Sequence, residues 1–158
     1  MLLNCLRSAE INVFATVTKL VNNRFIGRME TGIYMKRIMF VDNDVLALQL
    51  MEKASRLLGY QAITSSSARQ ALVLAEDENP SLVFVDLQMD DMDGWEFIRQ
   101  MRKSPGIAHL PVLVFSAGTA FSDEKLAREV GANGFLNKPI SLADLSKAVQ
   151  NFALQGSS

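Results

Sequence analysis

From residue 36 onward, the chain alternates between two patterns of apolar and polar positions. Short apolar runs without polar alternation are typical of strands that are buried on both faces. Between them lie longer segments in which apolar residues recur every three or four positions, as on one face of an amphipathic helix. The short runs predict strands over residues 37–41, 60–64, 82–85, 111–116 and 134–137. The longer segments predict helices over residues 44–59, 67–79, 94–103, 123–131 and 141–153.

The same spacing predicts which helix residues contribute to the core. The first helix is expected to end at Gly59, and the last is expected to begin at a cap formed by Ser141. The apolar residues at helical spacing in the first helix are Ala47, Leu50, Met51, Ala54, Leu57 and Leu58. Those expected to face inward from the last helix are Leu142, Leu145, Val149 and Phe152.

Strict alternation of five strands with five helices predicts an α/β fold. Short connections between them imply a parallel sheet that right-handed crossovers cover on both faces. Five strands suit the flavodoxin-like, doubly wound order 2-1-3-4-5. In this order the switch point lies between strands 1 and 3, and ligands bind there at the carboxyl ends of the strands. We therefore expect a functional site where residues 37–41 and 82–85 end.

Residues 1–35 do not take part in this alternation. We interpret them as a poorly ordered N-terminal extension, in which residues 11–18 fit either a weak strand or a weak helix. Residues 36–153 are expected to form one domain, followed by a short tail over residues 154–158.

Composition and charge narrow the class of protein. Apolar residues make up 49% of the chain and charged residues 21%, which is a globular composition. A net charge of -1 gives no reason to expect direct nucleic-acid binding. No apolar run approaches the roughly 18 residues of a membrane span, and the N-terminus lacks the apolar centre of a signal peptide. Because the single cysteine, Cys5, also fits a reducing compartment, we expect a cytoplasmic protein.

Polar residues suited to phosphate chemistry follow four of the predicted strands. Carboxylates and carbonyl oxygens are ligands that Mg²⁺ prefers, and a carboxylate can act as a nucleophile toward phosphorus. A hydroxyl and an ammonium group can hold phosphoryl oxygens. The residues are Asp42 and Asn43 after the first strand, Asp86 at the end of the third, Ser116 at the end of the fourth and Lys138 after the fifth.

Four motifs in chain order resemble those of the receiver domains of bacterial two-component response regulators. They are "VDND" after the first strand, "VDLQMDDMDG" after the third, "FSA" after the fourth and "FLNKP" after the fifth. The resemblance covers about residues 36–153. It implies a stand-alone receiver domain with an N-terminal extension.

The resemblance also implies roles for individual residues. Asp86 would be the phosphoacceptor, and Ser116 and Lys138 would grip the phosphoryl group. Phe135 lies where the family keeps its aromatic switch residue, although a partly buried aromatic side chain without that role is an equally good interpretation. The Mg²⁺ ligands that it implies are Asp42, Asn43, Asp86 and the backbone carbonyl of Gln88.

The function that the resemblance implies is that of a phosphoacceptor signalling switch in a two-component phosphorelay. A sensor histidine kinase or a phosphotransfer protein would donate the phosphoryl group from a phosphohistidine to Asp86. The signal would pass to an unknown downstream protein target through protein contacts, without direct nucleic-acid binding or membrane contact. The protein would phosphorylate and dephosphorylate only itself, so we do not expect an enzyme that turns over a separate substrate.

Two positions depart from the family pattern. Asn43 stands where the family usually has a second acid, and its neutral oxygen would hold a metal more weakly. Asp90 occupies a loop position that proline usually holds. We interpret Asp90 and Asp91 as solvated turn acids, and Asp44 as a capping residue at the start of the first helix.

Two other functions remain compatible with the sequence. Asn43 motivates a phosphorylation-independent interaction module that keeps the fold with a weakened site. The "DND" at 42–44 also looks like the D-x-D nucleophile motif of haloacid-dehalogenase-type phosphohydrolases. That family needs an acidic metal pair after the lysine, however, and only Asp144 follows Lys138. Asp86 would then have no role.

Overall fold

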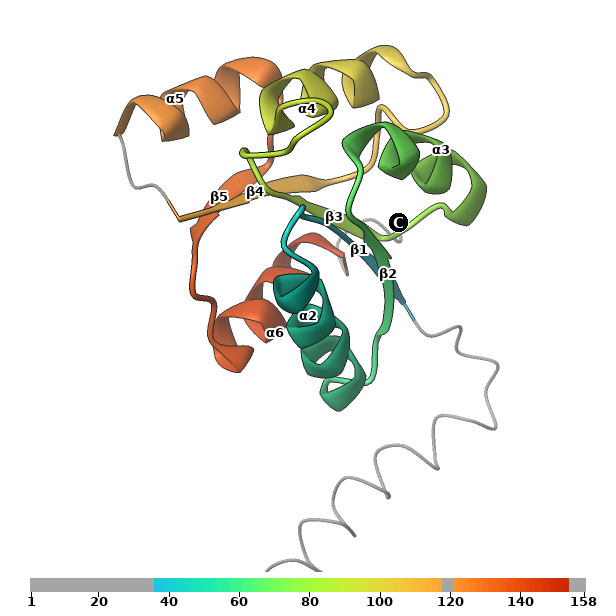
Figure 1. Cartoon of the computed structure of the whole chain (residues 1–158), viewed down its shortest axis with the longest axis vertical. Helices are drawn as coiled ribbons and strands as arrows, with labels where there is room; N and C mark the ends of the chain where they lie inside the picture. Colours follow the sequence, from blue (N-terminus) through green and yellow to red (C-terminus); the bar gives the residue numbers. More distant parts are fainter. Residues whose placement is uncertain (1–35, 118–120, 154–158) are drawn as a thin grey trace, which may run out of the picture. The chain divides into compact units, whose positions relative to one another are not determined.

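The computed structural model describes residues 36–117 and 121–153 (Figure 1). In this part of the chain, five parallel strands form one sheet in the order β2-β1-β3-β4-β5, so the predicted α/β fold and strand order are confirmed. The predictions for residues 1–35 and 154–158 lie outside the described residues. The strands are β1 (Arg37–Val41), β2 (Gln61–Ser65), β3 (Leu82–Val85), β4 (Val112–Ser116) and β5 (Gly134–Asn137).

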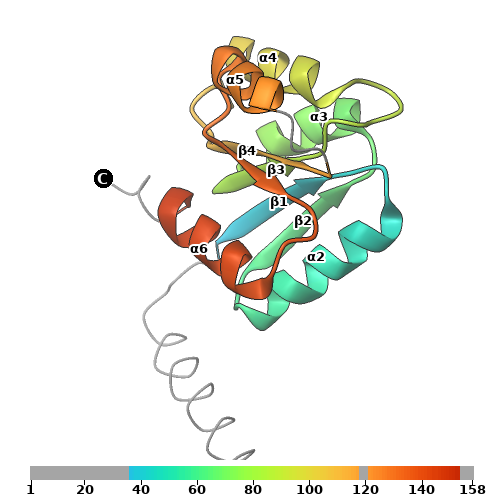
Figure 2. The ribbon, with the colours of Figure 1, turned by 90° about the vertical axis from the view of Figure 1, so that its left-hand side faces the viewer.

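Helices cover both faces of the sheet, with α2 and α6 on one face and α3, α4 and α5 on the other (Figure 2). Helix α5 begins two residues before the predicted position. Among the described residues, no helix has both the length and the apolar character needed to cross a membrane. The helices are α2 (Val45–Leu57), α3 (Ala68–Glu78), α4 (Gly94–Lys103), α5 (Phe121–Val130) and α6 (Leu142–Phe152).

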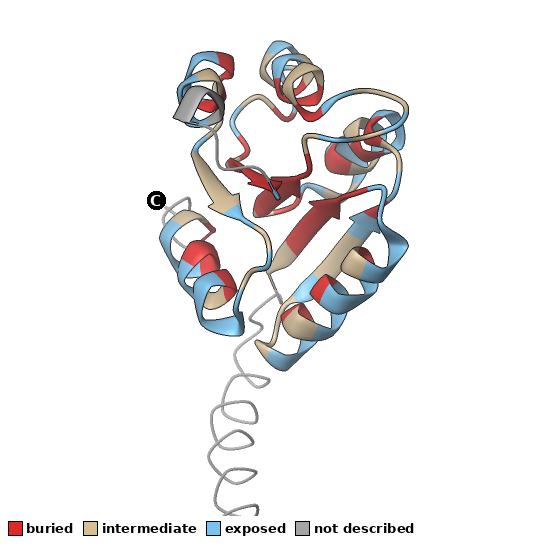
Figure 3. Cartoon of the chain, turned by 60° about the vertical axis from the view of Figure 1, so that its left-hand side comes forward, coloured by how far each residue is buried: buried red, intermediate tan, exposed pale blue. Residues whose placement is uncertain are grey.

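The central strands are buried along almost their whole length (Figure 3). Every residue of β3 and β4 is buried, and β1 is buried from Ile38 onward. This is the burial that their unbroken apolar runs predict, because helices pack on both sides of a parallel sheet. Side chains at the carboxyl ends of β1, β3 and β4 are therefore largely shielded from water.

Side chains cap the helix N-termini near the carboxyl edge of the sheet. Asp44 accepts hydrogen bonds from the backbone N–H groups of Leu46 (2.9 Å) and Ala47 (3.3 Å), which confirms its predicted capping role. Ser141 caps α6 as predicted, by accepting a hydrogen bond from the N–H of Asp144 (3.1 Å). The carboxylate of Asp44 is thus engaged by the backbone of α2. Ser67 and Asp93 cap α3 and α4 in the same way.

Three leucines with apolar helical spacing lie outside the core. Leu50 and Leu57 of α2 are 61% and 76% exposed, and Leu142 of α6 is 45% exposed. Helix α2 instead buries Leu48 and Met51, which are spaced to face the sheet. The expectation that Leu142 faces inward is wrong, because the buried side of α6 begins only at its second turn.

Candidate functional site

Three charged side chains meet at the carboxyl edge of the sheet, and we call Asp42, Asp86 and Lys138 the ionic triad. The ammonium Nζ of Lys138 donates a hydrogen bond to Asp42 Oδ2 and lies 3.3 Å from Asp86 Oδ2. Asp42 and Asp86 are only 3% and 7% exposed. Buried carboxylates are costly unless a cation or hydrogen bonds compensate them. Lys138 supplies one positive charge against two negative ones, so the triad retains an excess of negative charge.

The strand ends fix where the two carboxylates lie. The N–H of Asp42 donates to the carbonyl of Ser65 on β2 (3.1 Å), and the N–H of Asp86 donates to the carbonyl of Val41 on β1 (2.9 Å). These bonds extend the parallel ladders by one residue beyond each strand. The backbones of both acids are therefore held in place by the sheet.

Backbone N–H groups also fix how the carboxylates are turned. Asp42 Oδ1 accepts a hydrogen bond from the N–H of Asp44 (2.8 Å), and Asp86 Oδ1 accepts one from the N–H of Leu87 (2.8 Å). In each acid the other oxygen, Oδ2, faces the ammonium of Lys138. Each carboxylate thus has one oxygen bound to the backbone and one directed to the shared cation.

Ser116 and Lys138 lie at the ends of neighbouring strands. The N–H of Lys138 donates to the carbonyl of Ser116 (2.9 Å), and the peptide bond between Lys138 and Pro139 is cis. The side chain of Ser116 is buried at the end of β4. The predicted hydroxyl and ammonium groups are therefore held on adjacent strands. Their contact with a phosphoryl group stays a prediction.

Gly94 closes the loop that follows Asp86. A β-carbon at this position would lie 2.4 Å from the backbone carbonyl oxygen of Asp86, which is closer than any side chain can approach. The N–H of Gly94 donates to the carbonyl of Leu87 (3.1 Å), so residues 87–93 form a tight loop that returns to the strand end. Glycine is needed here because helix α4 starts against the backbone of the predicted phosphoacceptor.

Asn43 and Gln88 lie at the exposed rim of the site. The side-chain amide Nδ2 of Asn43 donates to Asp90 Oδ1 (3.3 Å), which joins the loop after β1 to the loop after β3. Asp90 is exposed, as predicted, but it has this protein partner. The roles of Asn43 and the Gln88 carbonyl as metal ligands stay predictions.

Asp91 was expected to be a solvated turn acid, and that interpretation is wrong. Its carboxylate accepts hydrogen bonds from the hydroxyl of Ser67 (2.8 Å) and from the N–H groups of Ala68 and Arg69 (both 3.0 Å). The bond from Arg69 is the main reason that the pKa of Asp91 falls from 3.8 to about 2. Asp91 therefore anchors the loop after β3 to the N-terminus of α3.

Phe135 is partly buried on β5. It lines a surface hollow of about 310 Å³ together with residues of α5, among them Ala127 and Arg128. This position fits the simpler of the two interpretations from the sequence, that of a partly buried aromatic side chain. Its role as a switch residue stays a prediction.

The described residues contain no group of three or more His, Cys, Asp or Glu side chains that could hold a metal ion. The predicted ligand set contains only two acids, Asp42 and Asp86, so it is not such a group and stays a prediction. The remaining ligands would be the amide oxygen of Asn43 and a backbone carbonyl. The donor atoms are all hard oxygens, which suits Mg²⁺ better than a softer metal.

Comparison with known proteins agrees with the fold. The polar-differentiation response regulator DivK of Brucella ovis is 26% identical over 117 residues, which cover 74% of this chain and 95% of that protein. Chemotaxis protein CheY4 of Vibrio cholerae superposes with a TM-score of 0.72 at 26% identity, over 75% of this chain and 99% of that chain.

A third comparison shows the fold alone. The receiver domain of a sensor histidine kinase from Pseudomonas aeruginosa has a TM-score of 0.70 at 22% identity, over 76% of this chain and 98% of that chain. That structure is described with a magnesium ion coordinated in its active-site cleft.

The sequence pattern of the response regulator receiver domain family matches residues 38–150, which include all three members of the ionic triad. The chain therefore belongs to the response regulator receiver domain family.

Proposed function

We propose that this protein is a phosphoacceptor switch of a two-component phosphorelay, in which Asp86 receives a phosphoryl group from a phosphohistidine. The observation that carries the proposal is the ionic triad at the switch point of the sheet. It unites a fixed carboxylate nucleophile with an ammonium group that can hold the incoming oxygens. The donor would be a sensor histidine kinase or a phosphotransfer protein.

In the proposed transfer, Asp86 acts as the nucleophile and not as an acid. A carboxylate oxygen of Asp86 attacks phosphorus, and an O–P bond forms while the N–P bond to the donor histidine breaks. The electron pair of that bond stays on the imidazole nitrogen. Lys138 and Ser116 would stabilise the phosphoryl oxygens during this step by charge and by hydrogen bonding. Water later attacks phosphorus, which releases inorganic phosphate and restores the carboxylate.

The excess negative charge of the triad favours a divalent cation beside it. Asp42, Asp86, the Asn43 amide oxygen and the Gln88 carbonyl would hold Mg²⁺, and the magnesium described for the Pseudomonas aeruginosa domain supports this choice. The metal would neutralise charge on the phosphoryl oxygens. With an amide at position 43, we expect binding that is weaker than at a site with three acids.

Phosphorylation by acetyl phosphate tests the proposal directly. The protein, incubated with acetyl phosphate and Mg²⁺, is expected to gain the mass of one phosphoryl group, and Asp86→Asn is expected to abolish this gain. Asp90→Asn is the matched control, because Asp90 is an exposed acid of the same loop outside the triad. A gain of mass that persists in Asp86→Asn, or that disappears in Asp90→Asn, would contradict the assignment.

Two alternatives predict different results in related assays. A phosphorylation-independent module, which the uncharged Asn43 favours, would gain no phosphoryl group at any Mg²⁺ concentration. A phosphohydrolase would turn over a generic phosphate monoester, and we expect no such turnover. The capping bonds of Asp44 count against a D-x-D catalytic pair, because its carboxylate is engaged by helix α2.

The output and the cellular location remain predictions. We propose that an unidentified protein target reads the phosphorylated state through protein contacts, without direct nucleic-acid binding. We also propose that the protein acts in the cytoplasm, where a histidine kinase would present its phosphohistidine.

A further inference from the structure

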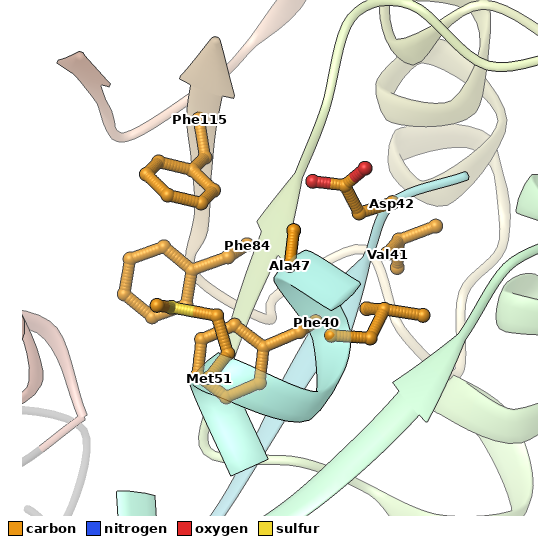
Figure 4. A pocket seen from close by; sticks show the side chains of 8 residues that line it. Phe40, Val41, Asp42, Ala47, Met51, Phe84 and Phe115 are labelled. Carbon is orange, nitrogen blue, oxygen red and sulfur yellow. The ribbon is translucent and has the colours of Figure 1, made fainter. Parts of the chain in front are cut away.

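Three phenylalanine rings lie beside the ionic triad on the α2 side of the sheet, and we call Phe40, Phe84 and Phe115 the aromatic floor. Figure 4 shows the three rings on one side of the pocket, with Asp42 across from Phe115 and with Met51 of α2 beside Phe84 and Phe40. The rings of Phe40 and Phe84 are stacked with centroids 5.1 Å apart. Phe84 and Phe115 meet edge to face at 6.3 Å. All three side chains are buried, so the floor is a rigid apolar surface.

Lys138 lies over one ring of this floor. Its Nζ is 5.0 Å from the centroid of the Phe115 ring, while the same ammonium contacts Asp42 and Asp86. An ammonium group within about 6 Å of an aromatic ring face is attracted by the quadrupole of the ring. The ammonium is thus held from three directions, by two carboxylates and by one neutral ring.

The ring contact differs from the ion pair with Asp86 in one respect that matters for the proposed reaction. Phosphorylation changes the charge and shape of Asp86, so the contact between Lys138 and that residue must rearrange. The ring of Phe115 is buried against Phe84 and carries no charge in either state. Lysine has a flexible four-carbon stem, and a fixed contact limits where its ammonium can go. The ring is therefore a contact of Lys138 that does not depend on the charge of Asp86.

We propose that Phe115 is a positioning residue for phosphoryl transfer, which holds the ammonium of Lys138 at the phosphoacceptor. The inference rests on the proposed function, because it gives Lys138 a phosphoryl group to hold. Phe115 acts through Lys138 and does not touch the reacting atoms. Phe84 offers a matched comparison, since it belongs to the same floor and packs on Phe115, whereas Lys138 lies over the Phe115 ring.

The test compares Phe115→Leu with Phe84→Leu and with the conservative variant Phe115→Tyr. Urea unfolding is expected to show similar losses of stability for the two leucine variants, because each removes one buried ring. With acetyl phosphate as donor, Phe115→Leu is expected to lower the maximal phosphorylation rate constant roughly fivefold. The half-saturating donor concentration should change little. Phe84→Leu should change the rate constant by less than about twofold, and Phe115→Tyr should restore it because it keeps the aromatic ring.

Equal rate losses in Phe115→Leu and Phe84→Leu would overturn the inference, since the floor would then act only through packing. Failure of Phe115→Tyr to restore the rate would also count against it. NMR of the Lys138 side chain gives a readout that needs no phosphorylation. The ring of Phe115 should shift the Cε proton resonances of Lys138, and this shift should vanish in Phe115→Leu but persist in Phe84→Leu.

The two readouts separate this inference from the proposed function. If the wild-type protein is never phosphorylated while the NMR shift behaves as expected, the proposed function fails but Phe115 does position Lys138. If the protein is phosphorylated and the NMR shift is the same in Phe115→Leu as in the wild type, Phe115 is not a positioning residue.

Discussion

The ionic triad and the loop over residues 87–93 carry the same kind of side chain but use it differently. The acids of the triad are buried at strand ends and share one ammonium. The acids of the loop are more exposed, and each is bound by a different part of the chain: Asp90 by Asn43, Asp91 by α3 and Asp93 by α4. Position relative to the strand end, and not residue type, separates the acids that share the Lys138 ammonium from the acids that fix a loop. The following substitutions test this difference, from the largest expected effect to the smallest.

Gly94, where the loop over residues 87–93 returns to Asp86, should be the position most sensitive to substitution. Gly94→Ala would place a β-carbon 2.4 Å from the carbonyl oxygen of Asp86, and backbone atoms on both sides must move to relieve it. We expect a loss of about 3 kcal/mol in the free energy of unfolding and a large loss of phosphorylation. Urea unfolding and intact-mass measurements provide the two readouts.

Gly106→Ala is the control for this substitution. A β-carbon at Gly106 meets no atom within 4 Å, so we expect a change of less than about 0.5 kcal/mol. Similar losses in the two variants would mean that the close approach of Gly94 to Asp86 does not constrain the site.

An acid at position 43 should give the exposed rim of the site a negative charge like those of the triad. Asn43→Asp supplies a negative charge to the predicted metal site, and we expect Mg²⁺ to bind roughly tenfold more tightly, or about 1.4 kcal/mol. Calorimetric titration with Mg²⁺ measures this. The new carboxylate would face Asp90, with which Asn43 now forms a hydrogen bond, so the metal-free protein should lose some stability.

The double variant Asn43→Asp with Asp90→Asn sharpens this experiment. It keeps the added charge but removes the repulsion, so it should bind Mg²⁺ tightly and recover the lost stability. Unchanged Mg²⁺ affinity in both variants would show that position 43 is not a metal ligand.

Asp91, which anchors the loop to α3, should make a smaller contribution to the free energy of unfolding, and this contribution should depend on pH. Asp91→Asn removes a charged cap from α3, and we expect a loss of about 1 kcal/mol at neutral pH. Because the pKa of Asp91 is lowered to about 2 in the folded protein, its contribution is complete above pH 3.8 and is lost as the pH falls through about 2.

Urea unfolding of both proteins across this pH range measures the difference. Wild type and Asp91→Asn should converge near pH 2, whereas Asp90→Asn should differ little from wild type at any pH. A difference between wild type and Asp91→Asn that stays constant down to pH 2 would mean that the hydrogen bonds of Asp91 do not depend on its charge.

Residues that follow strands could be placed from the sequence, because parallel strands end at one edge of the sheet. This reasoning brought Asp42, Asp86 and Lys138 together correctly, and it also identified Asp44 as a helix cap. The contact of Asp91 with α3 could not be found in this way. Its partners lie more than twenty residues earlier in the chain, and nothing in a local pattern distinguishes a solvated acid from a distant cap.

The faces of helices were harder to predict than their positions. Leu50 and Leu57 fit a helical stripe, but the stripe that packs on the sheet contains Leu48 and Met51. Helix α2 is rich enough in leucine to offer two apolar faces, and only the packing against β1 and β2 decides between them. The aromatic floor was missed for a related reason, because ring contacts depend on the register between strands.

In each carboxylate of the triad, one oxygen is bound to a backbone N–H group and the other faces Lys138. This arrangement has a consequence for the approach of a phosphoryl donor. In free aspartate the two oxygens interchange by rotation about one bond. In Asp86 a half-turn would exchange the N–H of Leu87 with the ammonium of Lys138, so the two oxygens are no longer equivalent. The rotational entropy of the Asp86 carboxylate is therefore lost during folding, and under the proposed function it would not be lost again when a donor binds. In the proposed reaction, a phosphohistidine donor would thus meet a preorganised carboxylate of defined orientation.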